Sequence, residues 1–500
     1  MTNGFLARLG RKLPIGANQP AGGSGLKKAL GGLDLIAIGL GTMIGGGIFT
    51  TIGPGVAKAG PAVVIAFVLA GLASLCAALC YAELGAIIPN AGSAYTFTYT
   101  SVGQLFGWII GWNLILEYAI SAAPVAQQFS QSFQEALHAL TGLALPGWAA
   151  KATLAHGIQW WQIDLAHSSY DLIGAVFILF LTALIIVGIR ETASANNVLV
   201  VIKILALLAF VFAGITLFHP HNLLPFNPVG LIGPLDKDGI PTGIIGAAAL
   251  VFFVYIGFDT ATTTSEECRN PARDIPVGVI GSLLIGTALY CAVAIVLVGS
   301  VPWKSVNVDT PLQSALAPLH NSLVEWIIRI GVLAGTSSVA LVSLLGQSRV
   351  FFAMARDRML PPVVAEIDPR FHTPAKMSLI TGVIVAAMTL IVPLDLLLAL
   401  VNIGTMSAFI FVCIGVLVMR HRYPNIHRPF RTPSVWLTAG SGILLSSLLG
   451  ILGFGLITLG TFLVWLLIGL VVYFSYGYWN ARPDIHGSVP DIEPPARSLY

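Results

Sequence analysis

A series of apolar stretches, most of them eighteen residues or longer and poor in charge, runs along nearly the whole chain. A helix of that length crosses the roughly 30 Å hydrocarbon core of a bilayer. Only 9% of the 500 residues are charged, compared with about 25% in soluble globular proteins. The stretches therefore predict an all-α polytopic membrane protein rather than several soluble domains.

Apolar runs and their polar breaks predict twelve transmembrane helices. The expected spans are 34–57, 61–88, 102–126, 172–189, 196–217, 242–264, 276–301, 324–348, 377–393, 395–420, 436–454 and 456–478. We expect a short cytoplasmic segment at 1–30, one transporter domain at 31–480 and a cytoplasmic tail at 481–500. Within the domain, one repeat covers about 31–218, a second covers about 240–420, and two additional helices occupy about 434–479.

The Lys and Arg residues between the spans are distributed unevenly. With the N-terminus placed in the cytoplasm, most of them fall in cytoplasmic segments, and the outer side holds only Lys58, Lys151, Lys237 and Lys304. Cytoplasmic loops of membrane proteins carry such an excess of positive charge. We therefore expect a multi-pass protein of the inner or plasma membrane with both termini in the cytoplasm.

Two of the predicted spans contain sequences that disrupt a helix. The first has five glycines in the nine residues from Gly39 to Gly47, and the sixth has Gly257 followed two residues later by Asp259. Each glycine weakens a helix by roughly 0.5–1 kcal/mol relative to alanine. Because the two spans lie five apart, they occupy equivalent positions in two inverted five-helix repeats, where transporters place their broken helices. Close helix packing is the alternative reading of such glycines.

An unwound turn at mid-membrane leaves backbone groups unpaired, and a zwitterion can pair with them. A carboxylate suits the N–H groups at the start of a half-helix, and an ammonium suits freed carbonyls. We therefore predict an amino acid substrate, bound between the two breaks by Met43, Ile44, Gly45, Gly46 and Gly47 and by Phe253, Val254 and Ile256.

Ionisable residues within the spans are a second signal, because burying each costs at least a few kcal/mol, and three of them are candidate functional residues. Lys203 is either a proton-coupling residue that gains and loses its proton during the cycle or a lysine that extends to the membrane surface. Glu117 and Asp259 either pair with a cationic substrate, relay protons or make structural hydrogen bonds. The hydroxyl of Ser343 either lines the pocket or bonds back to its own helix.

Other classes of function lack the residues they need. No basic run with interleaved aromatics is present, so nucleic acid is not an expected partner. The five cysteines are scattered without the spacing of a metal site, and no nucleophile motif suggests an enzyme. We expect no cofactor and no metal, with membrane lipid and an amino acid as the small-molecule substrate. An accessory single-span subunit is compatible with the sequence.

Several segments together resemble a known family. They are GLGTMIGGGIF at 39–49, YAEL at 81–84, PNAGSAY at 89–95, GWNLILEY at 111–118, EECRNPARDIP at 266–276 and RVFFAMARD at 349–357. Over residues 28–480 the chain resembles the amino acid–polyamine–organocation superfamily, in particular the bacterial twelve-helix form of its cationic amino acid transporter branch.

The resemblance implies a leucine-transporter-type fold of two inverted five-helix repeats plus two helices, working by alternating access. It implies proton-coupled symport of cationic (arginine, lysine) or small neutral (alanine) amino acids, with Lys203 linked to protonation and Glu117 and Asp259 near the pocket. It places Ser343 where side-chain size tunes selectivity. An amino acid/polyamine exchanger and a sodium-coupled symporter remain alternatives, although the lysine argues against sodium.

Overall fold

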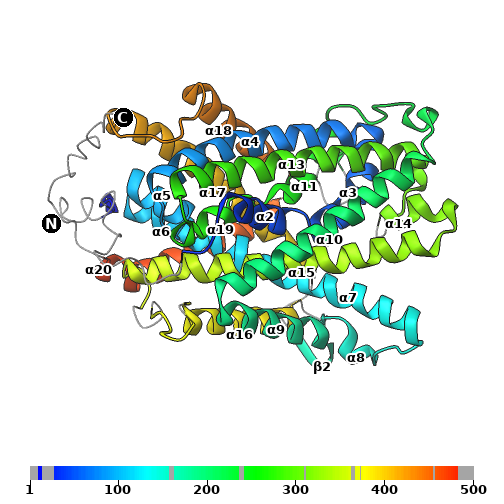
Figure 1. The fold of residues 1–500 in the computed structure, drawn as a ribbon, viewed down its shortest axis with the longest axis horizontal. Coiled ribbons are helices and arrows are strands. Elements are labelled where there is room, and N and C mark those ends of the chain that lie inside the picture. Colours follow the sequence, from blue (N-terminus) through cyan, green and yellow to red (C-terminus); the bar gives the residue numbers. More distant parts are fainter. Residues whose placement is uncertain are drawn as a thin grey trace, which may run out of the picture.

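The computed structural model of the chain is a bundle of long, roughly parallel helices (Figure 1). It describes residues 9–13, 28–156, 163–235, 241–308, 311–361, 366–371, 373–392, 394–453 and 456–481. Most of the predicted segment 1–30, and the tail 481–500 apart from Ala481, lie outside the described residues. Below, the end of the bundle that carries α20 (left in Figure 1) is called the α20 end, and the opposite one the α14 end.

The first part of the chain forms helices, with one short hairpin between them. In order these are α2 (Gly32–Met43), α3 (Gly46–Ala59), η1 (Gly60–Ala62), α4 (Val63–Ile87), α5 (Ala94–Ser101), α6 (Gln104–Leu114), the π-helix η2 (Ile115–Ile120), α7 (Ser121–Thr141), α8 (Gly147–Ala150), β1 (Thr153–His156), β2 (Ile163–Ser169), α9 (Leu172–Val187), α10 (Ile189–Ile215) and η3 (Pro220–Leu223).

The regular elements among the described residues of the second part are helices, apart from an isolated bridge between Leu235 and Pro241. The elements are α11 (Gly243–Val251), η4 (Phe252–Tyr255), α12 (Thr260–Thr263), η5 (Ser265–Glu267), α13 (Pro271–Ser300), η6 (Trp303–Ser305), α14 (Pro311–Leu316), η7 (Ala317–Leu319), α15 (Ser322–Arg356), α16 (Ala375–Ile391), α17 (Leu394–Arg422), α18 (Val435–Gly453), α19 (Leu456–Val472), the π-helix η9 (Tyr473–Gly477) and α20 (Tyr478–Asn480).

Helix lengths and composition confirm a polytopic helical membrane fold. Among the described residues, ten helical segments are long and apolar enough to cross a membrane, and α9 and α16 are shorter apolar helices. The number of twelve spans and the inverted repeat stay predictions. The hairpin of β1 and β2, which pair antiparallel in the predicted 127–171 loop, is an element that the sequence did not indicate.

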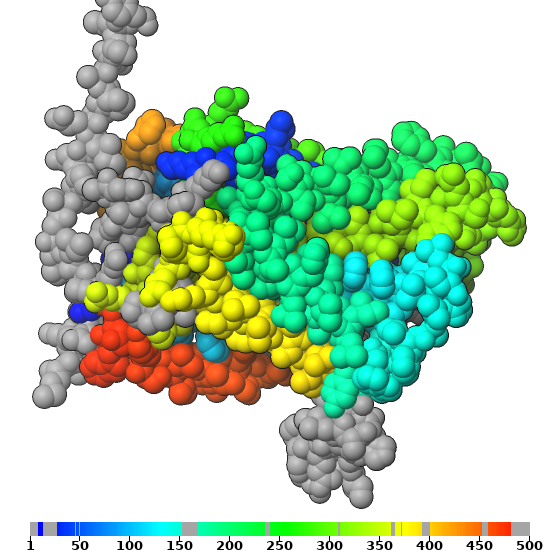
Figure 2. All heavy atoms as spheres, turned by 60° about the horizontal axis from the view of Figure 1, so that its bottom comes forward, coloured from blue at the N-terminus to red at the C-terminus, as the bar shows by residue number. Residues whose placement is uncertain are grey.

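The broken helices lie in the middle of the bundle. Figure 1 shows α2 at the centre, and α2 packs against α10, α13 and α15. Outer helices present apolar side chains to the surroundings. In the most apolar part of Leu459–Asn480, which includes most of α19, only 11% is buried, and α9, α16 and α19 form part of the face in Figure 2. This distribution is expected of a bundle whose outer surface meets lipid, because lipid is as apolar as the side chains.

Three spans differ from their predicted limits by seven residues or more. The predicted eighth span ended at 348, but α15 continues to Arg356. The predicted third span, 102–126, is a chain of α6, η2 and α7 that continues to Thr141. The predicted fifth span began at 196, but α10 begins at Ile189, directly after Gly188. Its polar first turns are stabilised by contacts with α2, because Asn196 donates to the carbonyl of Ala37 at 2.9 Å and Asn197 to Asp34 at 3.1 Å.

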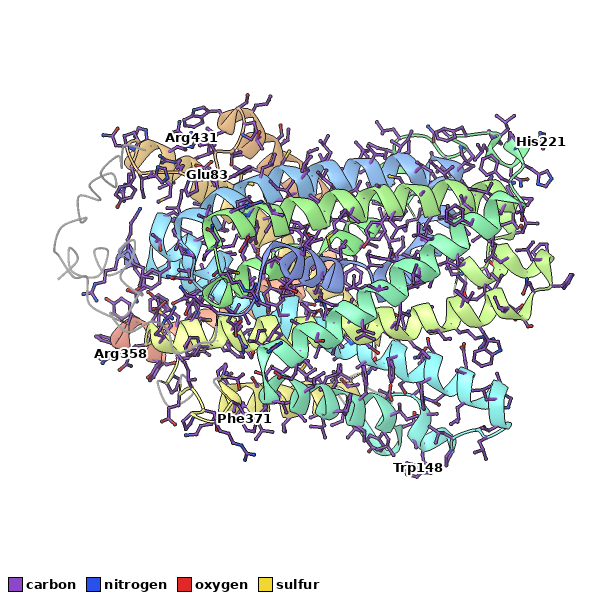
Figure 3. The ribbon with its side chains drawn as sticks, in the orientation of Figure 1. Glu83, Trp148, His221, Arg358, Phe371 and Arg431 are labelled. Atoms are coloured by element: carbon purple, nitrogen blue, oxygen red, sulfur yellow. The ribbon has the colours of Figure 1, made fainter. Side chains whose placement is uncertain are left out.

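Charged side chains cluster at the α20 end. Figure 3 shows Glu83, Arg358 and Arg431 there, and His221 and Trp148 toward the α14 end. The buried carboxylate of Glu83 accepts from Arg420 at 2.8 Å and from Arg428 at 3.1 Å. These bonds attach the segment after α17 to α4.

Candidate functional site

The first broken helix consists of α2, α3 and two connecting residues. The two connecting residues, Ile44 (φ −84°, ψ 92°) and Gly45 (φ −157°, ψ −143°), are not helical. A Cβ at Gly45 would lie 2.0 Å from Cγ2 of Val339 and 2.9 Å from the carbonyl oxygen of Gly335. The break therefore packs directly on α15. The last carbonyls of α2 and the first N–H groups of α3 meet here without partners inside their helices.

The second broken helix consists of α11, η4 and α12. After η4, Ile256 is extended (φ −64°, ψ 132°) and Gly257 has φ +112°, a conformation that favours glycine. A Cβ at Gly257 would lie 2.3 Å from the Cβ of Thr42, in the last turn of α2. The two breaks therefore touch each other at Thr42 and Gly257.

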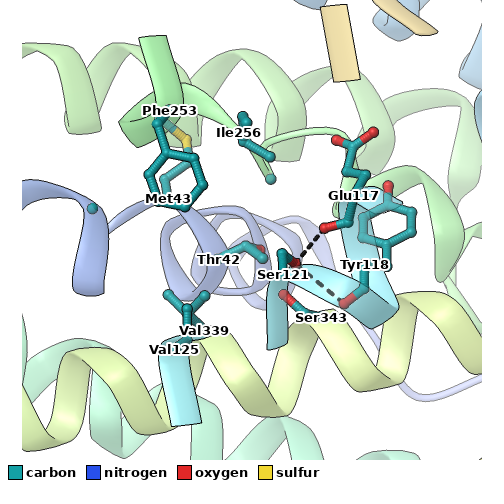
Figure 4. A pocket seen from close by; sticks show the side chains of 12 residues that line it. Thr42, Met43, Glu117, Tyr118, Ser121, Val125, Phe253, Ile256, Val339 and Ser343 are labelled. Carbon is teal, nitrogen blue, oxygen red and sulfur yellow. Dashed lines mark hydrogen bonds between the residues drawn. The ribbon is translucent and has the colours of Figure 1, made fainter. Parts of the chain in front are cut away.

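A narrow cavity lies where the two breaks meet (Figure 4). Four helical segments contribute to its wall: both broken helices, the span of α6, η2 and α7, and α15. Its lining residues are Thr42, Met43, Gly47, Glu117, Tyr118, Ser121, Val125, Phe253, Ile256, Gly257, Val339 and Ser343. Figure 4 shows Glu117, Tyr118, Ser121 and Ser343 on one side, and Met43, Phe253, Val125 and Val339 on the other. The wall thus has a polar and an apolar part.

Met43, Gly47, Phe253, Ile256, Glu117 and Ser343 were predicted at the site and line this cavity. The remaining predicted residues do not. Ile44 and Gly45 form the break itself, and Gly46 begins α3. Val254 lies behind the wall, where its carbonyl accepts a hydrogen bond from the hydroxyl of Tyr290 at 3.1 Å. The predicted role of Val254 at the site stays a prediction. That the lining residues bind a substrate stays a prediction.

Two buried carboxyl groups lie together at the polar part of the cavity. The hydroxyl of Tyr118 donates to Oδ2 of Asp259 at 2.5 Å, and Glu117 lies close to Asp259 and to Thr405. Both oxygens of Glu117 and Oδ1 of Asp259 lack a well-formed hydrogen bond within the described part of the chain. Acceptors left in this state are costly, so the pair is suited to receive a proton or a cationic group.

Lys203 of α10 lies outside the cavity, behind the first break. Its ammonium donates to the carbonyl of Gly41 at 2.8 Å and contacts the hydroxyl of Ser338 at 2.5 Å, and that hydroxyl also donates to Gly41 at 2.8 Å. The side chain is fully buried and does not extend to the bundle surface. It therefore pairs with a carbonyl of the last turn of α2, where the break removes the next helical donor.

Sequence reasoning missed several lining residues: Thr42, Tyr118, Ser121, Val125, Gly257 and Val339. Tyr118 and Ser121 belong to or follow the π-helix η2, which lies within a span predicted as a regular helix. Pro124 was the available signal, because a proline has no N–H for the carbonyl four residues before it and so disturbs the preceding turn.

Ion pairs lie between the cavity and the α20 end. Arg349, about 9 Å along α15 from Ser343, makes a fully buried pair with Glu267 through bonds of 2.8 and 3.3 Å. Arg356 makes a bidentate pair with Glu266 at 2.8 and 2.9 Å. Within the described residues, no group of three or more His, Cys, Asp or Glu side chains is placed to hold a metal ion.

Comparison with known proteins agrees with this architecture. The family model described as amino acid permease matches residues 30–475. Branched-chain amino acid permease BcaP of Bacillus subtilis (strain 168) is 41% identical over 463 residues, which is 92% of this chain and 96% of the relative. Methylthioribose transporter of the same strain is 38% identical over 454 residues, 90% and 94% of the two chains. Cationic amino acid transporter 4, vacuolar, of Arabidopsis thaliana is 35% identical over 403 residues, 80% and 64%.

The fold and the site define a multi-pass membrane transporter, and the names of the relatives agree with the expectation that it is not an enzyme. The chain belongs to the amino acid permease family, within the amino acid–polyamine–organocation superfamily, and has cationic amino acid transporters among its relatives. The resemblance of the sequence segments to that superfamily is thereby confirmed.

Proposed function

We propose that the protein is a secondary active transporter that moves an α-amino acid across the membrane by alternating access. The observation that carries this proposal is the cavity at the contact of two broken helices. The substrate carboxylate binds the first N–H groups of α3, at the positive end of its dipole. The substrate ammonium binds carbonyls at the end of α2 and in η4. Transport follows as the two broken helices move together relative to α15.

The wall favours particular side chains. The carboxyl group of Glu117 and the small side chain of Ser343 suit arginine or lysine, and a short side chain such as that of alanine is the neutral alternative. A second candidate is a branched aliphatic amino acid, because Val125, Val339 and Phe253 form the apolar part of the wall and the 41% identical relative is named a branched-chain permease.

For coupling we propose symport with a proton carried by Lys203. Its protonated ammonium holds the carbonyl of Gly41 by a charge-assisted bond, which is about twice as strong as a neutral one. Loss of the proton weakens that contact and lets α2 move. The ammonium also supplies the positive charge that a sodium ion would otherwise supply, so sodium coupling is the less favoured mechanism. Exchange of one amino acid or polyamine for another is the remaining alternative.

The proposed location is the cell membrane, with both termini in the cytoplasm. The support is the excess of Lys and Arg in the segments assigned to the cytoplasmic side, which include Arg349, Arg356, Arg420 and Arg428 of the α20 end. In this orientation the ion pairs of Arg349 and Arg356 lie on the cytoplasmic side of the cavity.

Uptake into proteoliposomes tests the proposal. Radiolabelled arginine, lysine, alanine and leucine, with methylthioribose as a fifth probe, are offered with and without an inward proton gradient or sodium. We expect accumulation of at least one amino acid, driven by the proton gradient. Replacement of Lys203 by Met should abolish gradient-driven accumulation, whereas Lys151→Met, at an exposed lysine, should not.

Three results contradict parts of the proposal. Uptake of methylthioribose alone would overturn the amino acid substrate. Accumulation that requires sodium and is unchanged in Lys203→Met would overturn proton coupling through this lysine. Uptake that occurs only against a preloaded amino acid or polyamine would show exchange instead of symport.

A further inference from the structure

The π-helix η2 widens one turn of the span that carries the acidic residue of the cavity. A π-helical turn inside an α-helix holds one additional residue, and such turns are frequent at functional sites. Here the consecutive residues Glu117 and Tyr118 of the widened turn both line the cavity. The turn therefore carries two polar groups of the wall, the carboxyl group of Glu117 and the Tyr118 hydroxyl that bonds to Asp259.

Two side chains stabilise the backbone of this turn. The hydroxyl of Ser121 donates to the carbonyls of Glu117 and Tyr118 from within the same span. The second comes from another helix: Oε1 of Gln347, on α15, accepts a hydrogen bond from the N–H of Ala119 at 3.2 Å. Gln347 is fully buried, and its contact joins the backbone of the widened turn to α15.

The surroundings of Gln347 connect it to the site. It lies one turn after Ser343, which lines the cavity. A Cβ at the adjacent Gly346 would lie 3.1 Å from Cγ2 of Thr260 and 3.4 Å from Cδ1 of Tyr118. The same turn of α15 therefore contacts the Tyr118 ring and α12, directly after Asp259.

The amide nitrogen of Gln347 has no hydrogen-bond partner among the described residues, although it is buried. An unpaired buried donor is costly, and a leucine of similar shape would avoid that cost. The side chain is an amide nevertheless, and its oxygen accepts the hydrogen bond from the N–H of Ala119. Local rules of packing are broken in this way where function requires it.

We infer that Gln347 is a positioning residue of the transport site: it holds η2 in its widened form and so sets Glu117 and Tyr118 against Asp259 and the substrate. This inference rests on the proposed function, which it extends from the residues of the wall to the residue that fixes their position. Gln347 itself does not line the cavity.

The test replaces Gln347 with Leu, which keeps the size and removes the acceptor. Gln127→Leu is the matched control. Gln127 is a buried glutamine of α7, in the span that contains η2, and it bonds to the carbonyls of Thr389 and Val392, away from the cavity. We expect Gln347→Leu to raise KM roughly two- to tenfold, the range that the loss of one hydrogen bond gives. Gln127→Leu should leave KM unchanged at a similar melting temperature.

A double-mutant cycle separates positioning from general structural damage. If Gln347 acts through Tyr118, Tyr118→Phe and Gln347→Leu together should raise KM no more than the larger single change. Independent, multiplying effects of the two replacements would overturn the inference, as would an unchanged KM in Gln347→Leu.

Hydrogen exchange gives a readout that does not need transport. The N–H groups of residues 115–120 should exchange at least several-fold faster in Gln347→Leu than in the wild type or in Gln127→Leu. Equal protection in all three proteins would refute the inference. If the wild type carries none of the amino acids, the proposed function fails, and the exchange result still decides whether Gln347 holds the turn.

Discussion

The contact between Gly257 and Thr42 makes the meeting of the two breaks sensitive to a single methyl group. Gly257→Ala would introduce a side chain at φ +112°, which costs about 1–3 kcal/mol of backbone strain. The new Cβ would lie 2.3 Å from the Cβ of Thr42, and such overpacking costs a further 1–3 kcal/mol or so. We therefore expect the free energy of unfolding to fall by about 2–6 kcal/mol in total.

The two contributions can be measured separately by equilibrium unfolding in mixed micelles. Thr42→Gly removes the Cβ that the new methyl group would meet. Gly257→Ala should therefore cost about 1–3 kcal/mol less in the Thr42→Gly background than in the wild type, because only the overpacking part is removed. Gly440→Ala is the control, because a Cβ at that helical glycine of α18 would have no neighbour within 4 Å. It should be neutral or stabilising by up to about 1 kcal/mol.

Transport should fall in Gly257→Ala and recover partly in the double variant, since the methyl group separates the two breaks. A Gly257→Ala protein whose unfolding free energy and uptake match those of the wild type would refute the close contact of the two breaks, and with it the origin of the cavity.

Two further predictions concern the α20 end. Glu267→Gln should lower the unfolding free energy by about 3–5 kcal/mol because it leaves the fully buried Arg349 without its counter-charge, and adding Arg349→Met should restore much of the loss; equal stability of both variants would contradict this. Burial and the nearby Arg422 lower the pKa of Lys12 from 10.5 to about 8. Docking of residues 9–13 should therefore strengthen as pH rises from about 8 toward 10.5. Over this interval the docked segment has already released the proton of Lys12, whereas the undocked segment still binds it. Protease cleavage of this segment in the wild type, relative to Lys12→Met at each pH, should decrease over that interval; a constant ratio would show that Lys12 does not control docking.

The sequence located the broken helices well because the signal is local. Glycines remove helix stability wherever they cluster, and the break at Ile44 and Gly45 falls inside the predicted stretch. The second break at Gly257 was found for the same reason, aided by the acid at Asp259. Charge within apolar runs also identified Lys203 and Glu117, since few other charged residues are found there.

Features that depend on contacts between distant segments were not predictable in this way. The hydrogen bond from Tyr290, on α13, to the carbonyl of Val254 is one such contact. The lower limit of α10 was placed too late because polar residues such as Asn196 look like a loop until α2 supplies their partner. The role of Gln347 depends on the same kind of contact, because its acceptor matters only once the turn at Ala119 is known to be widened.

The additional residue in η2 also shifts the phase of every position that follows it. One residue corresponds to about 100° of rotation in an α-helix, so a helical wheel continued from α6 through η2 would misplace each position of α7 by about that angle. Positions for labels or cross-links beyond residue 120 are therefore chosen from the wheel of α7 alone.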